Sequence, residues 1–323
     1  MWLYVSYCIL CSAVTFVLLM SALRMKIARR TAERRERRYA RRYMQMITGS
    51  MLNGESVPMA RFPMCERSGA KAVLAQLLAA ASASTCAGEP AGAVRRMVAA
   101  NGIEGWLLRR VRHSHGYTRA RYLAMLSALP VSHTTAEYLH RYSSDKERLI
   151  RFRTMLVEIA AEPSSAVRAL SAYPYPMTHL EMAELTSMLR RGLLPLAYAP
   201  LLSSSNRNLR MLGLNIVRIF GITEAEYLLR NLLADDDATP ESDEIHYETI
   251  CVLVSLHLPV SHRRTVNRIR TLTPDARRAL FRRLVSEGYS VAVLMRLADK
   301  EEHPYIESLA ASYKRTLVCH FQM

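Results

Sequence analysis

The chain has 323 residues, of which half are hydrophobic and 22% are charged, so it can bury a sizeable core and lacks the composition of a disordered protein. Only 7% of the residues are aromatic, and there are 12 Gly and 13 Pro, whereas Ala, Leu, Met and Arg are abundant. This composition favours helices over strands and tight turns. We therefore predict an all-α protein.

The formal net charge of +16 is concentrated near the N-terminus. Residues 24–42 hold ten Lys or Arg and two Glu, which gives +8 in that segment alone. We interpret the remaining +8 as spread over solvated helix faces. The total charge therefore does not by itself indicate a nucleic-acid-binding protein, because such proteins carry a basic patch on the folded domain.

An uncharged run, Trp2–Leu23, precedes the basic segment. As a helix, its 22 residues would reach about 33 Å, enough for a hydrocarbon core of about 30 Å. A cleaved signal peptide is disfavoured, because the start is uncharged and the basic residues follow the apolar run. We predict a single-pass transmembrane helix over residues 1–23 in the cell (inner) membrane. Because Lys and Arg stay on the cytoplasmic side, the N-terminus would lie outside and the main body in the cytoplasm.

The basic juxtamembrane segment, 24–44, is also expected to contact anionic lipid. Its candidate membrane-surface residues are Arg29, Arg30, Arg34, Arg35, Arg37, Arg38, Arg41 and Arg42. Residues 45–67 mix Gly, Pro, Asn and Ser without helical periodicity, so we predict a linker there. The main body is predicted to occupy residues 68–323.

Internal repetition is the most informative feature beyond Asn101. Similar segments recur as RYLAM at 121–125 with RMLGL at 210–214, TTAEYL at 134–139 with TEAEYL at 223–228, and LPVSH at 129–133 with LPVSH at 258–262. A unit of about 30 residues explains these offsets, if an insertion lengthens the last of them. We assign that insertion to the acidic segment Asp235–Glu244, which is either a solvated loop or a docking point for a basic partner.

Each unit is predicted to be a hairpin of two helices, the second with the clearer apolar stripe. The stripes are Leu209, Leu212, Gly213, Ile216, Val217 and Phe220 in one copy, Leu149, Phe152, Leu156, Ile159 and Ala160 in an earlier copy, and Leu280, Phe281, Leu284 and Val285 in a later one. Starting points near Glu104, Thr134, Pro163, Leu193, Thr223, Ser261 and Tyr289 give seven hairpins. Because no hairpin can cover its own stripe, neighbouring hairpins must stack.

The segment PLLSSSNRNLRMLGLNIVRIFG, Pro200–Gly221, resembles a HEAT repeat of the short kind first noted in phycobilisome lyases. An apolar helix end, a small polar turn and an Arg at the start of the second helix carry the resemblance, with Arg207 or Arg210 at the repeat's Arg position. Ser203–Asn206 replaces the usual acidic turn. The resemblance covers roughly residues 100–320, chiefly through periodicity. It implies an α-solenoid with a concave, ligand-facing row of second helices, here about seven HEAT-like hairpins after one transmembrane helix, and no chemistry by itself.

Two groups of polar residues are candidates for binding. Arg190, Arg191, Tyr198, Asn206, Arg207 and Arg210 form a candidate partner-binding face, where guanidinium groups would bind a carboxylate or phosphate. The other interpretation is structural: one Arg per unit ties successive turns together, as HEAT-like repeats imply. His113 and His115 form an H-x-H, which is either a metal-binding pair or two polar turn residues.

Signs of catalysis are few. The sequence contains no phosphate-binding loop, dinucleotide fingerprint, nucleophile elbow or HExxH motif. The cysteines are expected to be reduced core residues, and the CxxC of Cys8 and Cys11 lies inside the uncharged run. We predict no catalytic residue, no metal and no cofactor.

Three functions remain. We predict a non-catalytic, membrane-tethered scaffold or adaptor that presents its solenoid surface to other proteins, themselves membrane-associated, at the cytoplasmic face and within a cell-envelope assembly. One alternative is a nucleic-acid-binding or base-repair HEAT-like protein, but nucleic acid is disfavoured because Trp106 is the only Trp outside the span. The other alternative is a lyase or isomerase of the phycobilisome type, which the resemblance alone suggests.

Overall fold

The computed structural model describes the backbone of residues 2–52, 62–84, 89–190, 197–234 and 240–320. Side chains are described over the same ranges, apart from residues 2–19, 21, 22, 25, 28, 29, 32, 52, 89–91, 190, 240, 241 and 314–320. The described residues contain 17 α-helices, a few short 3-10 turns and no strand. The predicted all-α class is confirmed.

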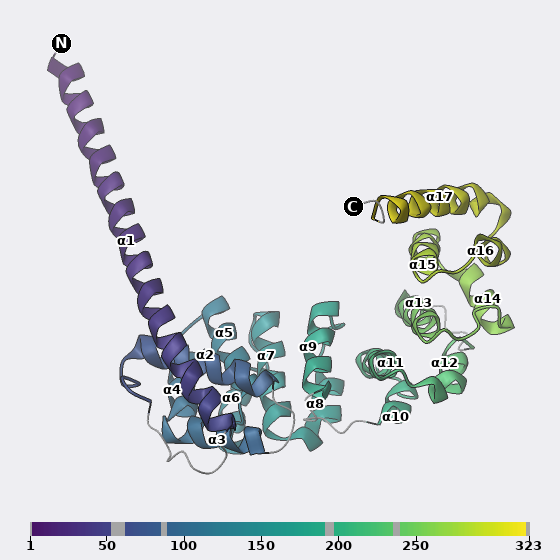
Figure 1. Cartoon of the computed structure of the whole chain (residues 1–323), viewed down its shortest axis with the longest axis horizontal. Coiled ribbons are helices and arrows are strands. Elements are labelled where there is room, and N and C mark those ends of the chain that lie inside the picture. Colours follow the sequence, from purple (N-terminus) through teal and green to yellow (C-terminus); the bar gives the residue numbers. More distant parts are fainter. Residues whose placement is uncertain (1, 53–61, 85–88, 191–196, 235–239, 321–323) are drawn as a thin grey trace. The chain divides into compact units, whose positions relative to one another are not determined.

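The chain folds as two compact units, the first ending at Pro163 and the second beginning at Ser164. The first unit holds α1 (Trp2–Leu52), α2 (Ser68–Ser84), α3 (Glu89–Ala100), α4 (Ile103–Arg112), α5 (Gly116–Ala128), α6 (His133–Leu139) and α7 (Arg148–Ala161) (Figure 1). The second unit holds α8 (Ala166–Ala172), α9 (His179–Arg190), α10 (Tyr198–Leu202), α11 (Arg207–Phe220), α12 (Glu226–Leu232), α13 (Pro240–Ser255), α14 (Arg263–Thr271), α15 (Pro274–Ser286), α16 (Val291–Leu297) and α17 (His303–His320).

Beyond Asn101 the helices that the structure describes come in seven pairs, each a shorter first helix and a longer second one. The pairs are α4 with α5, α6 with α7, α8 with α9, α10 with α11, α12 with α13, α14 with α15, and α16 with α17. Every pair begins within five residues of its predicted starting point. The repeated segments occupy equivalent places, since RYLAM and RMLGL lie in second helices and both copies of LPVSH lead into a first helix.

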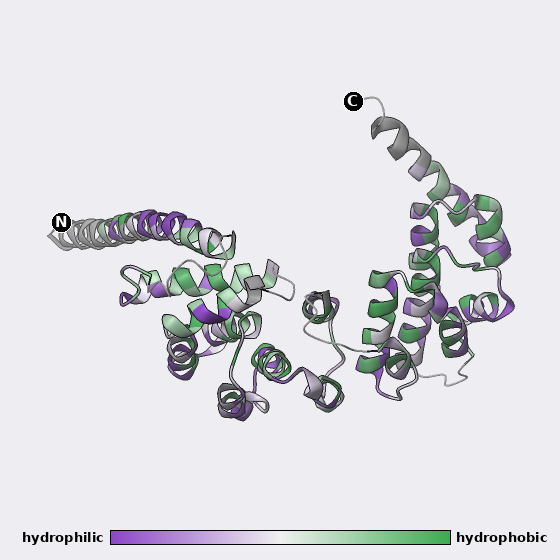
Figure 2. Ribbon diagram, turned by 60° about the horizontal axis from the view of Figure 1, so that its bottom comes forward, coloured by the Kyte–Doolittle hydropathy of each residue, from purple (hydrophilic) through white to green (hydrophobic). Residues whose placement is uncertain are grey.

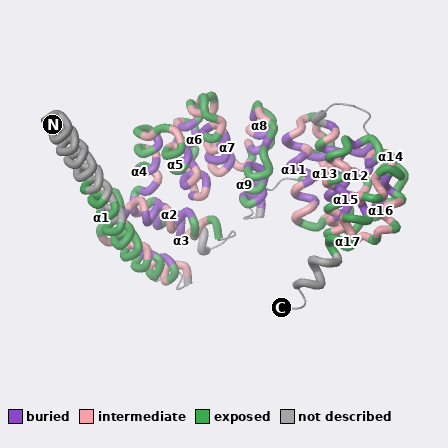
Figure 3. The backbone as a smooth tube through the Cα atoms, turned by 90° about the horizontal axis from the view of Figure 1, so that it is seen from above, coloured by how far each residue is buried: buried purple, intermediate pink, exposed green. Residues whose placement is uncertain are grey.

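Within each unit, consecutive second helices pack side by side. In the first unit α5 lies between α2 and α7, with α4 against α5 and α6 against α7. In the second unit α9, α11, α13, α15 and α17 contact one another in chain order, while α10, α12 and α16 cover their own partners. Figure 3 shows the buried residues along the sides of these helices that face their neighbours. Stacking therefore buries stripes that no single pair could cover.

The predicted stripes are buried except near helix ends. Leu212 and Val217 of α11 are fully buried, and Phe152 of α7 is 1% exposed. Phe220 is 54% exposed and Leu149 39% exposed, so the prediction is wrong at these two positions. Both lie in a terminal turn, where the helix has reached the edge of the packed layer.

The predicted linker at 45–67 is wrong over residues 45–52, which continue α1 as helix. Tyr43 and Ile47, one helical turn apart, are 0% and 2% exposed and belong to the core that α2 and α3 share with α1. Burying them favours the helix more than the Gly and Ser of this stretch oppose it. Residues 53–61 lie outside the described part of the chain.

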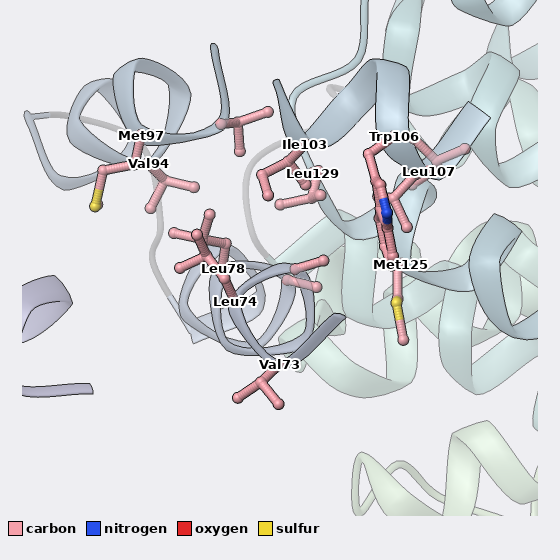
Figure 4. Packing of buried hydrophobic residues seen from close by; sticks show 14 of the residues in the cluster. Val73, Leu74, Leu78, Val94, Met97, Ile103, Trp106, Leu107, Met125 and Leu129 are labelled. Atoms are coloured by element: carbon pink, nitrogen blue, oxygen red, sulfur yellow. The ribbon is translucent and has the colours of Figure 1, made fainter. Parts of the chain in front are cut away.

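A continuous apolar core holds the first unit together. Figure 4 shows Leu74 and Leu78 of α2 lying between α3, which contributes Val94, and the start of α4, which contributes Ile103. All four of these side chains are fully buried. The same cluster reaches Tyr43 and Ile47, so the C-terminal end of α1 is part of this core.

The acidic insertion is shorter than predicted. Residues 235–239 lie outside the described part of the chain, and residues 240–244 form the start of α13 instead of a loop. Pro suits the first turn of a helix, and Asp243 and Glu244 place negative charge at the positive end of the helix dipole.

Gly213 sets how closely α10 and α11 approach. A Cβ atom added there would lie 3.0 Å from Cδ2 of Leu202 and 3.1 Å from Cβ of Leu201. We expect Gly213→Val to lower the free energy of unfolding of the second unit by about 2–3 kcal/mol, because the crossing is already filled. Urea denaturation, followed by helical circular dichroism, measures this.

Gly105 of α4 provides the matched control, because nothing lies within 4 Å of a Cβ added there. Gly105→Ala should raise stability by up to about 1 kcal/mol through helix propensity alone. Equal effects of the two substitutions would show that the α10–α11 crossing does not depend on a missing side chain.

Candidate functional site

The basic run of α1 is an exposed, helical surface. Of the eight candidate membrane-surface residues in it, the side chain of Arg29 is not described and the other seven are all exposed. The exposed residues are Arg30, Arg34, Arg35, Arg37, Arg38, Arg41 and Arg42. Figure 2 shows this stretch of α1 as hydrophilic. One side of the helix becomes covered only from Tyr39 onward, where the contacts with α2 and α3 begin. The arginines up to Arg38 thus surround the helix.

In the part of the chain that the structure describes, no helix is both long enough and apolar enough to cross a membrane. The uncharged run Trp2–Leu23 falls, apart from Met20 and Leu23, outside the residues whose side chains are described. The transmembrane helix and its orientation therefore stay predictions.

The structure describes only some of the candidate partner-binding residues. Arg190 is the last residue of α9 and its side chain is not described, and Arg191 lies outside the described residues. Tyr198 is half-buried at the start of α10. The described backbone therefore places three of the six, Asn206, Arg207 and Arg210, around the first turn of α11.

These three side chains have partners within the second unit. Asn206 caps α11 by accepting a hydrogen bond from the backbone N–H of Leu209, and its amide donates to the carbonyl of Ser171 at 3.3 Å. Arg207 forms an ion pair with Glu244 of α13, and Arg210 donates to the carbonyl of Ser204. Their contacts favour the structural interpretation, and binding of a partner protein by them stays a prediction.

Other arginines join neighbouring helix pairs in the same way. Arg230 of α12 is 8% exposed, and its guanidinium donates to the Thr265 hydroxyl and the Pro259 carbonyl, both at 3.1 Å. Arg268 of α14 donates to the Leu233 carbonyl at 3.2 Å. Further pairs of this kind are Arg119 with Asp145 at 3.2 Å and Arg277 with Asp299 at 2.8 Å. Arginine is therefore a recurring connector between pairs.

Two buried asparagines hold irregular backbone against a helix, and no sequence pattern predicts this role for them. Asn208 of α11 accepts a hydrogen bond from the Met177 N–H at 3.0 Å and donates to the Tyr175 carbonyl at 2.9 Å. Asn101 accepts from the Phe62 N–H at 3.0 Å. An amide can donate and accept at once, so one side chain satisfies backbone groups that no helix partner reaches.

The H-x-H lies at the turn between α4 and α5. His113 follows the last residue of α4 and His115 precedes the first residue of α5, and both are exposed. The Nδ1 atom of His115 lies 3.3 Å from Nη2 of Arg119. Among the described residues, no group of three or more His, Cys, Asp or Glu side chains could hold a metal ion.

Two described cysteines have chemistry suited to packing. Cys251 of α13 is fully buried, and burial raises the pKa of its thiol to about 11. Burial also raises the pKa of the half-buried Cys65 thiol. Both thiols are therefore protonated near neutral pH and are poor nucleophiles. Cys86 and the side chains of Cys8, Cys11 and Cys319 lie outside the described set.

Trp106 belongs to the core of the first unit. It is 8% exposed, its ring meets that of Tyr122 edge-on with the centroids 6.0 Å apart, and the guanidinium of Arg110 lies 5.4 Å from the ring centroid. A ring packed in this way offers no face on which a nucleic-acid base could stack.

The chain has a second basic segment, which contradicts the prediction that the charge outside residues 24–42 is spread over many helix faces. Residues 263–283, which form α14 and most of α15, contain eight Arg and one Asp, a net charge of +7. With the +8 of residues 24–42, the two segments carry +15 of the chain's +16. The remaining charge is thus not spread evenly, and a count in short windows would have shown it.

Comparison of the chain with models of known protein families, with curated proteins and with solved structures finds no match to any of them.

Proposed function

We propose that the chain is a membrane-tethered, non-catalytic scaffold. An N-terminal span over Trp2–Leu23, with the N-terminus outside the cell (inner) membrane, holds a HEAT-like α-solenoid of seven helix pairs at the cytoplasmic surface. The solenoid surface binds membrane-associated partner proteins, and tethering raises their local concentration without requiring tight intrinsic affinity.

One observation carries this proposal. A single helix, α1, joins the uncharged run through the exposed basic run to an anchor buried in the first unit, Tyr43 and Ile47. A helix rises about 1.5 Å per residue and does not fold back on itself, so within α1 the uncharged run lies at the end far from Tyr43 and Ile47. Positive charge beside the run favours the cytoplasmic side for the folded units.

The packing also fits a protein that binds partners on an extended surface and does not catalyse a reaction. Stacked pairs give an extended surface, and connectors such as Arg230 keep successive pairs in register. The nucleic-acid alternative loses support because Trp106, the only Trp outside the uncharged run, is buried and cannot stack on a base. No observation on the described residues favours the lyase alternative.

Alkaline extraction of membranes from cells that express the full chain tests the tether. We expect the wild type to stay in the membrane pellet. Leu10→Arg with Val14→Arg should move the protein to the supernatant, because each charge at the centre of a span costs about 2.5–3.5 kcal/mol. Leu180→Arg with Tyr227→Arg adds the same charge at side chains that are 72% and 73% exposed, and should leave the protein in the pellet. Extraction of the wild type into the supernatant would refute the tether.

Affinity purification in mild detergent after cross-linking in cells tests the scaffold role. Membrane-associated proteins should be recovered with the wild type and lost with the double arginine variant in the span. Recovery of the chain alone, under cross-linking that captures a known membrane complex, contradicts the scaffold role while leaving the tether intact.

A further inference from the structure

The connection between α6 and α7 carries a stack of tyrosine and arginine side chains. The Cζ atom of Arg141, in the 3-10 turn that follows α6, lies 3.4 Å from the ring centroid of Tyr138 and 5.2 Å from that of Tyr142. The Cζ atom of Arg119, on α5, lies 4.7 Å from the same Tyr142 centroid. These four side chains therefore form one continuous cluster within the first unit.

The two tyrosines hold the Arg141 guanidinium in a fixed place. Both rings are half-buried and pack against the apolar core of the first unit. At 3.4 Å the planar guanidinium lies flat on the Tyr138 ring, because an N–H directed at the ring would overlap it. A guanidinium held in this way keeps its N–H edge available for a bidentate acceptor and loses little further freedom when it binds one.

The fold uses only one of the two arginines in an ion pair. Arg119 is half-buried, and its Nη1 atom lies 3.2 Å from Oδ2 of Asp145. Arg141 is exposed, and among the described residues no carboxylate pairs with it. Glu137, one helical turn before Arg141, lies 3.4 Å from Nδ1 of His133 instead. Packing therefore accounts for the charge of Arg119 and not for that of Arg141.

The charge of this connection fits a single carboxylate. Arg119, Arg141 and Lys146 carry three positive charges against the two negative charges of Asp145 and Glu147, which leaves +1. A carboxylate has one negative charge and two oxygens, which match one guanidinium edge. A phosphoryl group carries about −1.5 to −2 and three acceptor oxygens, and it is typically bound by several arginines.

We propose that the cluster of Tyr138, Arg141 and Tyr142 binds an Asp or Glu side chain of a partner protein. This site rests on the proposed function, because it gives the scaffold a binding surface and a partner chemistry. Tyr and Arg are enriched among the residues that carry most of the binding energy in protein interfaces. Arg141 forms the ion pair with the partner, and the two tyrosines position its guanidinium.

Photo-cross-linking of the full chain in phosphatidylcholine nanodiscs tests this site. The probe is a Glu-rich peptide that carries one diazirine group, and mass spectrometry maps the labelled residues. We expect label on residues 138–147, and Arg141→Gln should reduce it at least about tenfold, because a charge-assisted hydrogen-bonded pair is lost. Label on the basic run 24–42, which attracts the peptide by charge alone, should not change.

Three further variants make the test specific. Arg121→Gln removes an exposed arginine of α5 outside the cluster and should retain the label on residues 138–147. Arg141→Lys keeps the charge but not the flat, bidentate geometry, and should lose most of that label. Tyr138→Leu should give an intermediate loss, and if this variant loses helicity the two substitutions at the exposed Arg141 still decide.

Two results of the labelling overturn the proposal. One is equal labelling of residues 138–147 in the wild type and in Arg141→Gln or Arg141→Lys. The other is stronger labelling of these residues by a phosphoserine version of the probe, which would identify a phosphoryl group as the occupant.

Recovery of partner proteins from cells distinguishes this site from the scaffold role. In the affinity purification described above, Arg141→Gln should reduce the recovery of membrane-associated proteins, whereas Arg121→Gln should not. Recovery that Arg141→Gln leaves unchanged overturns the proposal and leaves the scaffold role intact. Labelling that depends on Arg141, with no protein recovered from cells, supports the carboxylate site and contradicts the scaffold role.

Discussion

Tyr43→Ala will separate α1 from the first unit and lower that unit's free energy of unfolding by about 3–5 kcal/mol. The Tyr43 ring is fully buried, meets the Phe62 ring edge-on with the centroids 5.3 Å apart, and stacks on Tyr39 at 6.0 Å. Its hydroxyl donates to the Pro63 carbonyl at 2.7 Å. Truncation leaves a cavity beside the Phe62 ring and removes the donor to the Pro63 carbonyl.

Hydrogen exchange resolved by helix, together with urea denaturation, measures this effect. We expect faster exchange at the end of α1 and in α2 and α3, and unchanged exchange in α11 to α15. Tyr43→Phe is the matched control, because it keeps the ring and removes only the hydroxyl, at a cost of about 1 kcal/mol. Equal stability of Tyr43→Ala and the wild type would contradict the view that α1 is anchored there.

The same substitution, Tyr43→Ala, distinguishes attachment of the chain to the membrane from packing of α1 against the rest of the first unit. If Tyr43 joins the span to the first unit, Tyr43→Ala should remain in the membrane pellet after alkaline extraction, because the span itself is untouched. Trypsin should then cleave the connection between α1 and α2 more readily. The tether and the folded units are thus distinct parts, and Tyr43 couples them.

The pairing of helices could be predicted because its signals are local. LPVSH marks the start of a first helix twice, and stripes such as Leu280, Phe281 and Leu284 are buried as expected. The sequence-based prediction fails where a contact between residues far apart in the sequence overrides the local preference for helix or loop. Residues 45–52 look like a linker until Tyr43 and Ile47 are placed in the core of α2 and α3.

The candidate site was harder to predict because one residue type serves several purposes. In the sequence, Arg207 and Arg230 look alike, yet each meets a partner that only the fold brings near, Glu244 for Arg207 and Thr265 for Arg230. The second basic segment, 263–283, is the opposite case. Its charge is plain in the sequence, but which of its arginines are exposed depends on how α13 and α16 pack around it.

Arg230→Ala will destabilise the contact between the fifth and sixth helix pairs by about 2–3 kcal/mol, because it removes the donor to two groups of the next pair. Arg230 donates to the Thr265 hydroxyl, the Pro259 carbonyl and, at 2.8 Å from its Nε, the Glu226 carboxylate. Thr265 is fully buried, so without the guanidinium its hydroxyl has lost a donor that water cannot replace. Arg230→Lys should be intermediate, because one ammonium group cannot reach three acceptors on different elements.

Arg264→Ala is the control for Arg230→Ala, since Arg264 is exposed and donates to the Asn231 side chain at 3.0 Å. It should change stability by no more than about 1 kcal/mol. Stacked pairs can open separately, so exchange rates of α12 and α14 are a better measure than a single melting temperature. A small effect of Arg230→Ala would mean that apolar packing alone sets the register of the pairs.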